Sequence, residues 1–229
     1  DNEIQNEWVT VLDENYDEVF LGDLTFSPLQ KRLNAKKIIY RFHNSWLRLF
    51  SQIKPNSISN YISVGLLAFT EKRIVKNNNH ILTITEKDEA YLKRLNDNIS
   101  FFGINTDLFP KKRLKYLEDF KESKAVIWLG SVVDHHLKSV LELIKVYKSL
   151  KEQYPNLELL MFGKGTKKFN DPRSGIYGFG FYGPVDSFPV TKNYIYVNPD
   201  RHGVGIKIKS IDMIKSQLNL LTTPTGILG

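Results

Sequence analysis

Short runs of apolar residues alternate with longer stretches of helical spacing through the first half of the chain. The apolar and β-branched runs predict four strands, at residues 16–23, 36–44, 80–85 and 99–104. Between the second and third runs, residues 45–75 have helical spacing with a break at 54–57. Thr85 precedes an acid-rich segment, so we expect it to cap a helix that begins there. The first half therefore predicts strands followed by helices.

The same alternation restarts at residue 125, after a charged stretch. Five more strands are predicted, at residues 125–129, 157–162, 176–181, 194–197 and 218–221. A helix near 136–152 keeps an apolar stripe along one face. The charged stretch 110–124 predicts a helix and a linker, whereas 186–191 is too short for a full helix. Alternation of strands and helices is typical of an α/β fold with parallel sheets.

Composition narrows the class of protein. The chain has 229 residues, 41% of them hydrophobic, which suffices for one large core or two modest ones and argues against disorder. It contains no run of 18 apolar residues and no signal-like segment, so a cytoplasmic protein is predicted. The absence of cysteine excludes disulfides and thiolate metal sites. The net charge of +7 favours phosphate-rich partners: sugar nucleotides, lipid phosphates, an anionic membrane surface or nucleic acid.

A glycine-bearing turn follows the predicted strand at 194–197 and leads into a helix. Gly203 and Gly205 let the backbone approach a ligand closely, and the start of a helix offers unpaired N–H groups and a positive dipole end. Lys209 adds a full charge, and Asp212 lies three residues further along the same helix face. A cation for phosphate beside a carboxylate for hydroxyl groups suits a sugar nucleotide.

Each of these residues also has a purely structural interpretation, and the sequence leaves both open. The glycine pair could form a simple turn, Lys207 could be solvated, and Asp212 could be an exposed carboxylate. His43, at the end of the predicted strand 36–44, could be a core histidine or a ligand contact.

Two further features are interpreted as surface. His135 and His136 suggest zinc, but adjacent helical residues point apart and no third clustered ligand accompanies them. The lysine-rich stretch 110–124 is interpreted as a solvated linker face, with membrane or nucleic-acid contact as the alternative.

The spacing G-x-G-x-K-x-K-x-x-D from Gly203, with the strand at 218–221 and an expected loop at 222–226 behind it, resembles the donor-binding region of retaining GT-B glycosyltransferases of the group 1 (family 4) type. Other segments resemble the same family in the same order: Arg41-Phe42-His43-Asn44, Glu71, the stretch 81–88, the stretch 102–109 and Trp128-Leu129-Gly130-Ser131. The resemblance covers residues 16–229, and the order of the motifs carries it.

The resemblance implies an α/β fold of the GT-B type, in which two Rossmann-like domains face a cleft. Residues 1–120 would form a partial acceptor-side domain with a linker, and residues 121–229 a partial domain that binds the nucleotide sugar. The glycine-rich first turn of the usual N-terminal domain is absent and nothing follows Gly229, so we expect a chain truncated at both ends. Ser131 replaces the basic residue usual after the first donor strand, with Lys138 as a substitute.

The resemblance also implies an activity: retaining, metal-independent transfer of a sugar from a nucleotide-diphosphate donor to a glycan or lipid-linked acceptor. His43 and Lys209 are implied as catalytic contacts. The implied donor contacts are Gly130, Ser131, Gly203, Val204, Gly205, Lys209, Asp212 and Thr223. No metal and no cofactor beyond the donor substrate are expected, since the sequence contains no Asp-x-Asp pair for a divalent ion. The expected partners also include a membrane surface in peripheral contact, and they exclude nucleic acid.

Other functions stay open. A catalytically silent GT-B subunit that stabilises a partner transferase would keep the fold and lose donor ligands, and the replacement at Ser131 agrees with it. A sugar-nucleotide epimerase would use the same fold. A nucleic-acid binder would use the positive charge, but the basic residues are scattered and no RNA or DNA motif is recognised.

Overall fold

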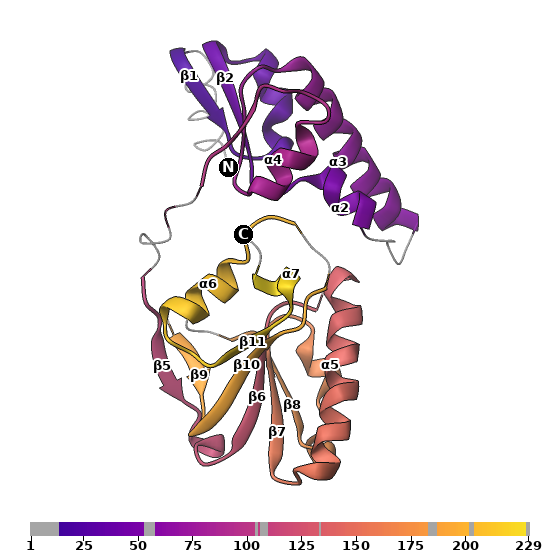
Figure 1. Cartoon of the computed structure of the whole chain (residues 1–229), viewed down its shortest axis with the longest axis vertical. Helices are drawn as coiled ribbons and strands as arrows, with labels where there is room; N and C mark the ends of the chain where they lie inside the picture. The colour runs from indigo at the N-terminus through magenta and orange to yellow at the C-terminus, as the bar shows by residue number, and fades with distance from the viewer. Residues whose placement is uncertain are drawn as a thin grey trace, which may run out of the picture. The chain divides into compact units, whose positions relative to one another are not determined.

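The structure is a computed structural model of the whole chain, and it describes residues 14–52, 58–103, 105, 110–132, 134–182, 187–201 and 204–227. The chain divides into two compact units, shown in Figure 1. The first comprises Asp1–Ile104 with Val204–Ile206 and Gly229, and the second comprises Asn105–Gly203 with Lys207–Leu228. The boundary predicted from the motifs, at residue 120, lies further along the chain than this division.

The first unit is built on a four-stranded parallel sheet in the order β1-β2-β3-β4. Its strands lie at the four predicted runs: β1 Asn15–Leu21, β2 Asn34–Phe42, β3 Ile81–Thr83 and β4 Ile99–Phe101. The helices between them are η1 Leu24–Lys31, α2 Trp46–Gln52, α3 Ile58–Asn77 and α4 Glu86–Leu92 (Figure 1). The break predicted at 54–57 lies outside the described residues. Tyr40, Phe42 and Ile81 are buried with Leu92 of α4, which fixes the helices to the sheet.

The predicted cap of α4 is confirmed. Thr85 precedes the helix with extended backbone, and its hydroxyl accepts a hydrogen bond from the Asp88 backbone N–H at 3.0 Å. The same hydroxyl donates to the Asp88 carboxylate at 2.8 Å. Three acidic residues in the first turn also favour a helix start, because they face the positive end of the helix dipole.

The second unit contains a five-stranded parallel sheet in the order β11-β10-β6-β7-β8. The strands are β6 Lys124–Leu129, β7 Leu157–Phe162, β8 Ile176–Gly180, β10 Asn193–Asn198 and β11 Leu220–Thr222. The main helices are α5 Asp134–Gln153, α6 Ile208–Lys215 and the single turn α7 Pro224–Ile227. Short 3₁₀ turns are η3 Glu118–Phe120, η4 Thr166–Phe169 and η5 Pro172–Ser174.

The central strands of this sheet are buried on both faces. Along β6, Ala125 and Ile127 enter one apolar cluster with Met213 of α6, whereas Val126 and Trp128 enter another with Val140 of α5. Continuous apolar runs of this kind are expected for a parallel sheet that is covered on both sides. The apolar runs of the sequence therefore identified the core of the second unit.

Two predictions about this unit are wrong. The stretch 110–124 is not a helix and a linker: it holds the strand β5 Arg113–Tyr116 and the turn η3, and β5 pairs in parallel with β9 Ser187–Val190. Every residue of β5 is exposed, so its side chains carry no apolar period and only backbone pairing makes it a strand. The segment 222–226, predicted as a loop, contains most of α7.

Candidate functional site

The order of strands in the second unit creates a switch point between β6 and β10. From β6 the chain adds β7 and β8 on one side of the sheet, and then returns to add β10 and β11 on the other side. Gly130 and Ser131 follow β6, and Asp200 follows β10, so these residues flank the switch point at the carboxyl edge of the sheet. Open α/β sheets bind their ligands at this position, which makes this edge the candidate site.

Lys209, in the first turn of α6, lies at the end of β6. Its Nζ atom is 5.7 Å from the centroid of the buried Trp128 ring, within the range of a cation–π interaction. A Cβ atom added at Gly130 would lie 3.3 Å from this Nζ and 3.1 Å from the Trp128 ring. A side chain at position 130 would therefore crowd the ammonium group. The structure brings together two of the predicted donor contacts, Gly130 and Lys209.

A buried carboxylate, Asp200, supports this lysine. Its Oδ1 atom is 2.9 Å from Nδ1 of His136, at the start of α5, and only 3% of Asp200 is exposed. Burial favours the neutral acid, but the His136 hydrogen bond and the charges of His136, Lys209 and Lys207 outweigh it and hold the pKa of Asp200 below its ordinary value. Asp200 is therefore a carboxylate that fixes His136 and adds negative charge beside Lys209.

Lys209 is itself partly desolvated. Burial lowers the pKa of its ammonium group, Asp200 opposes this shift, and Lys207 adds to it. A diphosphate at this position would add negative charge next to Nζ and would raise the pKa of Lys209 again, since a nearby anion favours the charged amine. The site is thus suited to bind an anion, which would favour the charged form of Lys209.

Sequence reasoning missed Asp200 and misread His136. The histidine pair was interpreted as surface, but the His136 side chain is partly buried and paired with Asp200. The position of Asp200, just after an apolar strand that borders the switch point, was the signal that could have found it. Within the described ranges, no three His, Cys, Asp or Glu side chains are grouped to hold a metal ion.

Thr223 has a different environment from the one predicted for a donor contact. Its hydroxyl donates to the backbone carbonyl of Asp200 and accepts from the Gly226 backbone N–H at 3.0 Å, so it caps α7 and holds the loop after β10. Behind it, the Asn198 amide donates to Ser210 of α6 and to the Gly226 carbonyl, both at 2.9 Å. These bonds join β10, α6 and α7, and they fix the segment that carries Asp200.

Asp212 and Lys209 have different charged neighbours. Asp212 is partly buried, and burial raises the pKa of its carboxyl against the opposing charges of Lys112 and Lys215. The charges that act on Lys209 are instead those of Asp200 and Lys207. Both residues lie in α6, three positions apart as the sequence predicted, but different charged groups act on them. One oxygen of Asp212 is buried without a hydrogen-bond partner in the described part of the chain, so the carboxylate keeps acceptor capacity.

The glycine turn before α6 is described in part. Gly205 has a φ of +69°, a left-handed conformation that glycine adopts without strain, and Val204 beside it is buried. Gly203, predicted as a donor contact, lies outside the described residues. Ser131, the residue in place of the usual basic one, is exposed at the end of β6.

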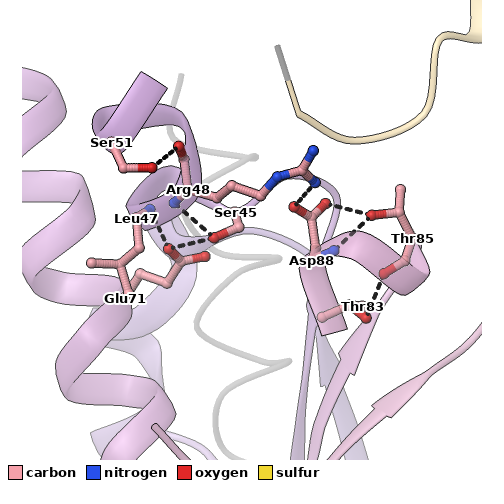
Figure 2. Close-up of polar contacts among 8 residues, drawn as sticks. All are labelled: Ser45, Leu47, Arg48, Ser51, Glu71, Thr83, Thr85 and Asp88. Atoms are coloured by element: carbon pink, nitrogen blue, oxygen red, sulfur yellow. Dashed lines mark hydrogen bonds and ion pairs between the residues drawn. The ribbon is translucent and has the colours of Figure 1, made fainter. Parts of the chain in front are cut away.

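In the first unit, His43 lies in the turn between β2 and α2. Its side chain is exposed, which excludes the interpretation as a core histidine. The turn is held from behind by Ser45, whose hydroxyl accepts from the Arg48 backbone N–H at 3.2 Å and so caps α2. Glu71 of α3 accepts from the Leu47 backbone N–H at 2.6 Å and from the Ser45 hydroxyl at 3.2 Å, as Figure 2 shows.

The same network reaches α4. The Arg48 guanidinium donates to the Asp88 carboxylate at 2.8 Å, and both side chains are largely buried (Figure 2). Glu71 is fully buried, and burial raises its pKa to about 7 although hydrogen bonds from Leu47, Ser45 and Trp46 favour the charged form. The turn that carries His43 is therefore anchored to two helices of its own unit by buried polar bonds.

No protein-family model and no curated protein matches the chain. Its fold is similar to those of solved glycosyltransferases. For a mutant of S. aureus TarM in complex with fondaparinux, alpha-GlcNAc-glycerol and UDP, the TM-score is 0.58 at 14% identity, over 90% of this chain and 41% of that one. For the pneumococcal O-GlcNAc transferase GtfA in complex with UDP and GlcNAc, the TM-score is 0.61 at 12% identity, and the match covers 96% of this chain and 44% of that one. For trehalose-6-phosphate synthase, the TM-score is 0.51 at 12% identity, and the match covers 97% of this chain and 62% of that one.

These similarities establish the fold. The chain has the α/β fold of the GT-B glycosyltransferases, and the expected fold class is confirmed. It spans less than half the length of TarM and GtfA, so the activity, substrates and partners of the whole protein are proposals. Among the described residues, no helix is both long and apolar enough to cross a bilayer.

Proposed function

We propose that the chain is part of a retaining glycosyltransferase that takes a sugar from a nucleoside diphosphate and needs no metal ion. The observation that carries the proposal is the ammonium group of Lys209, held over Trp128 at the switch point of the second unit, beside Gly130 and the buried carboxylate of Asp200. The structures of TarM and GtfA noted above, which share the fold, contain UDP. A nucleotide-diphosphate sugar is the ligand that fits this charge and this position.

The residues divide into two proposed roles. Lys209, the backbone N–H groups near Gly130 and the start of α6 would bind the diphosphate, and Asp200 would keep Lys209 in place. Asp212, whose side chain is only partly buried, would bind ribose hydroxyls. Thr223 bonds to the loop after β10, so we assign it to positioning that loop rather than to contact with the donor. His43 remains the candidate contact to the donor sugar or to the acceptor hydroxyl.

The proposed reaction needs no base from the protein. The acceptor oxygen forms a bond to the anomeric carbon on the face that the diphosphate leaves, the bond from that carbon to the phosphate oxygen breaks, and the acceptor proton passes to the departing diphosphate. Negative charge grows on the diphosphate during this step, and Lys209 and the helix end would stabilise it electrostatically. A glycan or a lipid-linked sugar is the proposed acceptor class, and the cytoplasm is the proposed compartment.

A catalytically silent subunit is the second candidate. In the described part of the chain, the charges that act on Lys209 come from Asp200 and Lys207, and none comes from the segment after β6, where Lys138 was expected as a substitute. The site would then have one cation fewer than the resemblance implies, and it would bind a diphosphate more weakly. Such a subunit would bind and stabilise a partner transferase without turnover.

Transfer measured with radiolabelled donor sugars separates these candidates. The full-length protein should transfer sugar in excess chelator at a rate close to that with added Mg²⁺. Loss of transfer in chelator and its return with Mg²⁺ or Mn²⁺ would show that a metal ion does the work assigned to Lys209. No transfer under either condition, together with nucleotide binding, would favour the silent subunit.

A further inference from the structure

Helix α3 of the first unit has apolar residues on two opposite faces. The inner face contributes Ala68, Ile74 and Val75 to the core, each at most 6% exposed. The outer face carries five large apolar side chains that are 54–81% exposed, namely Ile58, Tyr61, Ile62, Leu66 and Phe69. Their spacing of three to four residues places them on one side of the helix. Tyr61 packs against Phe50 of α2, with ring centroids 5.1 Å apart. The packing of the described residues still leaves all five side chains of this set, the outer apolar row, more than half exposed.

Positive charge continues the same side of the helix. Lys72, Arg73 and Lys76 follow Phe69 at three, four and seven residues, and all three are exposed. Glu71 is the one acidic residue in the sequence of α3, and it is buried on the other side. The outer side is therefore apolar over its first three turns and basic over its last two.

The occupant of this side has to supply both negative charge and an apolar phase. A second copy of α3 does not fit, because no acidic residue of the helix is exposed there. Parallel pairing of two copies would place like charges together, and antiparallel pairing would place the lysines against Ile58. The outer apolar row from Ile58 to Phe69 spans about 17 Å at 1.5 Å per residue, which is too short to cross a hydrocarbon core of about 30 Å.

We propose that this side of α3 binds the surface of a bilayer that contains anionic phospholipid. The outer apolar row would enter the boundary between headgroups and acyl chains, and Lys72, Arg73 and Lys76 would lie at the headgroup phosphates. A helix with a large apolar face and basic residues beside it binds in this way. The apolar residues lie in the first turns of α3 and the basic residues in its last turns. This order fits a tilted helix whose first turns enter the bilayer, while the long basic side chains of its last turns extend to the phosphates.

The proposal predicts two independent losses of binding. Each basic residue at an anionic surface contributes about a five-fold change in partition coefficient, or about 1 kcal/mol, so the triple variant Lys72→Gln, Arg73→Gln, Lys76→Gln should bind about 100-fold more weakly. The double variant Leu66→Ser, Phe69→Ser keeps the charge and removes two apolar anchors, and it should lose at least ten-fold.

The test is vesicle flotation of the protein with neutral phosphatidylcholine vesicles and with vesicles of phosphatidylcholine and anionic phosphatidylglycerol. The control for charge is the variant Lys138→Gln, Lys145→Gln, Lys148→Gln, which removes three exposed lysines of α5. The control for apolar surface is Val146→Ser, Tyr154→Ser, because these side chains are both 57% exposed. Circular dichroism checks the fold of every variant.

We expect binding to the anionic vesicles alone, weakened by 1 M salt, lost in both α3 variants and kept in both controls. The proposal is overturned if the protein does not bind, if the α5 charge variant loses as much as the α3 variant, or if the serine double variant binds like the wild type. The proposal is also overturned if the wild type does not bind vesicles and sedimentation shows that it is a dimer whereas the serine double variant is a monomer. That result would assign the outer apolar row to self-association. Nucleotide binding takes no part in this assay, so its outcome is separate from that of the proposed donor site.

Discussion

The buried carboxyl of Glu71 makes the stability of the first unit depend on pH in a direction opposite to that of most carboxylates. Its pKa is raised from an ordinary value of 4.5 to about 7, chiefly by burial. Between these two values the folded chain holds a proton that the unfolded chain has released. The free energy of unfolding should therefore fall as pH rises from about 4.5 to about 7, and should stay low above that range.

The size of the effect follows from the same values. At 1.36 kcal/mol for each pH unit, the difference between 4.5 and about 7 corresponds to about 3 kcal/mol. The variant Glu71→Gln cannot ionise, and its amide can still accept from the Leu47 backbone N–H. The hydrogen bonds that favour the charged carboxylate are already included in this pKa, so they are not subtracted again. We expect Glu71→Gln to be about 3 kcal/mol more stable than the wild type at pH 8 and nearly equal to it at pH 4.5.

The measurement is urea unfolding of both proteins across this pH range, followed by tryptophan fluorescence, to which Trp46 at the border of the core of the first unit contributes. Glu86→Gln is the matched control, since Glu86 is exposed in the first turn of α4 and should not change the pH profile. The reasoning is refuted if the wild type and Glu71→Gln lose stability in parallel between pH 4.5 and 8.

Two other predictions concern the second unit. Asp212→Asn should weaken the binding of nucleotides that contain ribose and leave pyrophosphate binding unchanged, as measured by calorimetry; equal losses for both ligands would remove Asp212 from contact with the sugar. Gly226→Ala should destabilise the fold by about 1–3 kcal/mol, because the new Cβ would lie 2.3 Å from the Thr222 hydroxyl and 2.8 Å from the Asn198 carbonyl. Gly65→Ala is its control, since a Cβ there meets only ordinary contacts at 3.7 Å and should be neutral or slightly stabilising in thermal unfolding.

The strands could be predicted from the sequence where side-chain burial determines them. The runs at β6 and β7 are buried on both faces, so their apolar residues are continuous and easily recognised. β5 was not predicted, because its four residues are exposed and its pairing with β9 depends on backbone bonds between distant segments. The pattern of apolar residues in a short segment indicates which side chains are buried, whereas backbone pairing between distant segments leaves no such pattern in either segment.

The site could be predicted only in part for a similar reason. Gly130 and Lys209 were predicted from their motifs, and they lie together in the structure. The pairing of His136 with Asp200 joins residues 64 positions apart, and each alone resembles a surface residue in the sequence. Thr223 was assigned to the donor from the family resemblance, but its hydroxyl is already engaged with the loop and with α7. Hydrogen-bond partners decide such roles, and a single sequence does not contain them.

The most direct test of the proposed donor site is calorimetric titration of UDP and GDP into the wild type and into Lys209→Met. This variant keeps an apolar side chain over Trp128 and removes the charge that would meet the diphosphate. Lys138→Met is the control, as it removes an exposed lysine of the same unit. We predict that Lys209→Met weakens the better of the two nucleotides by about 1.5–3 kcal/mol, or roughly 10- to 150-fold, while Lys138→Met binds like the wild type. Equal affinity in the wild type and in Lys209→Met would contradict the assignment of the phosphate site.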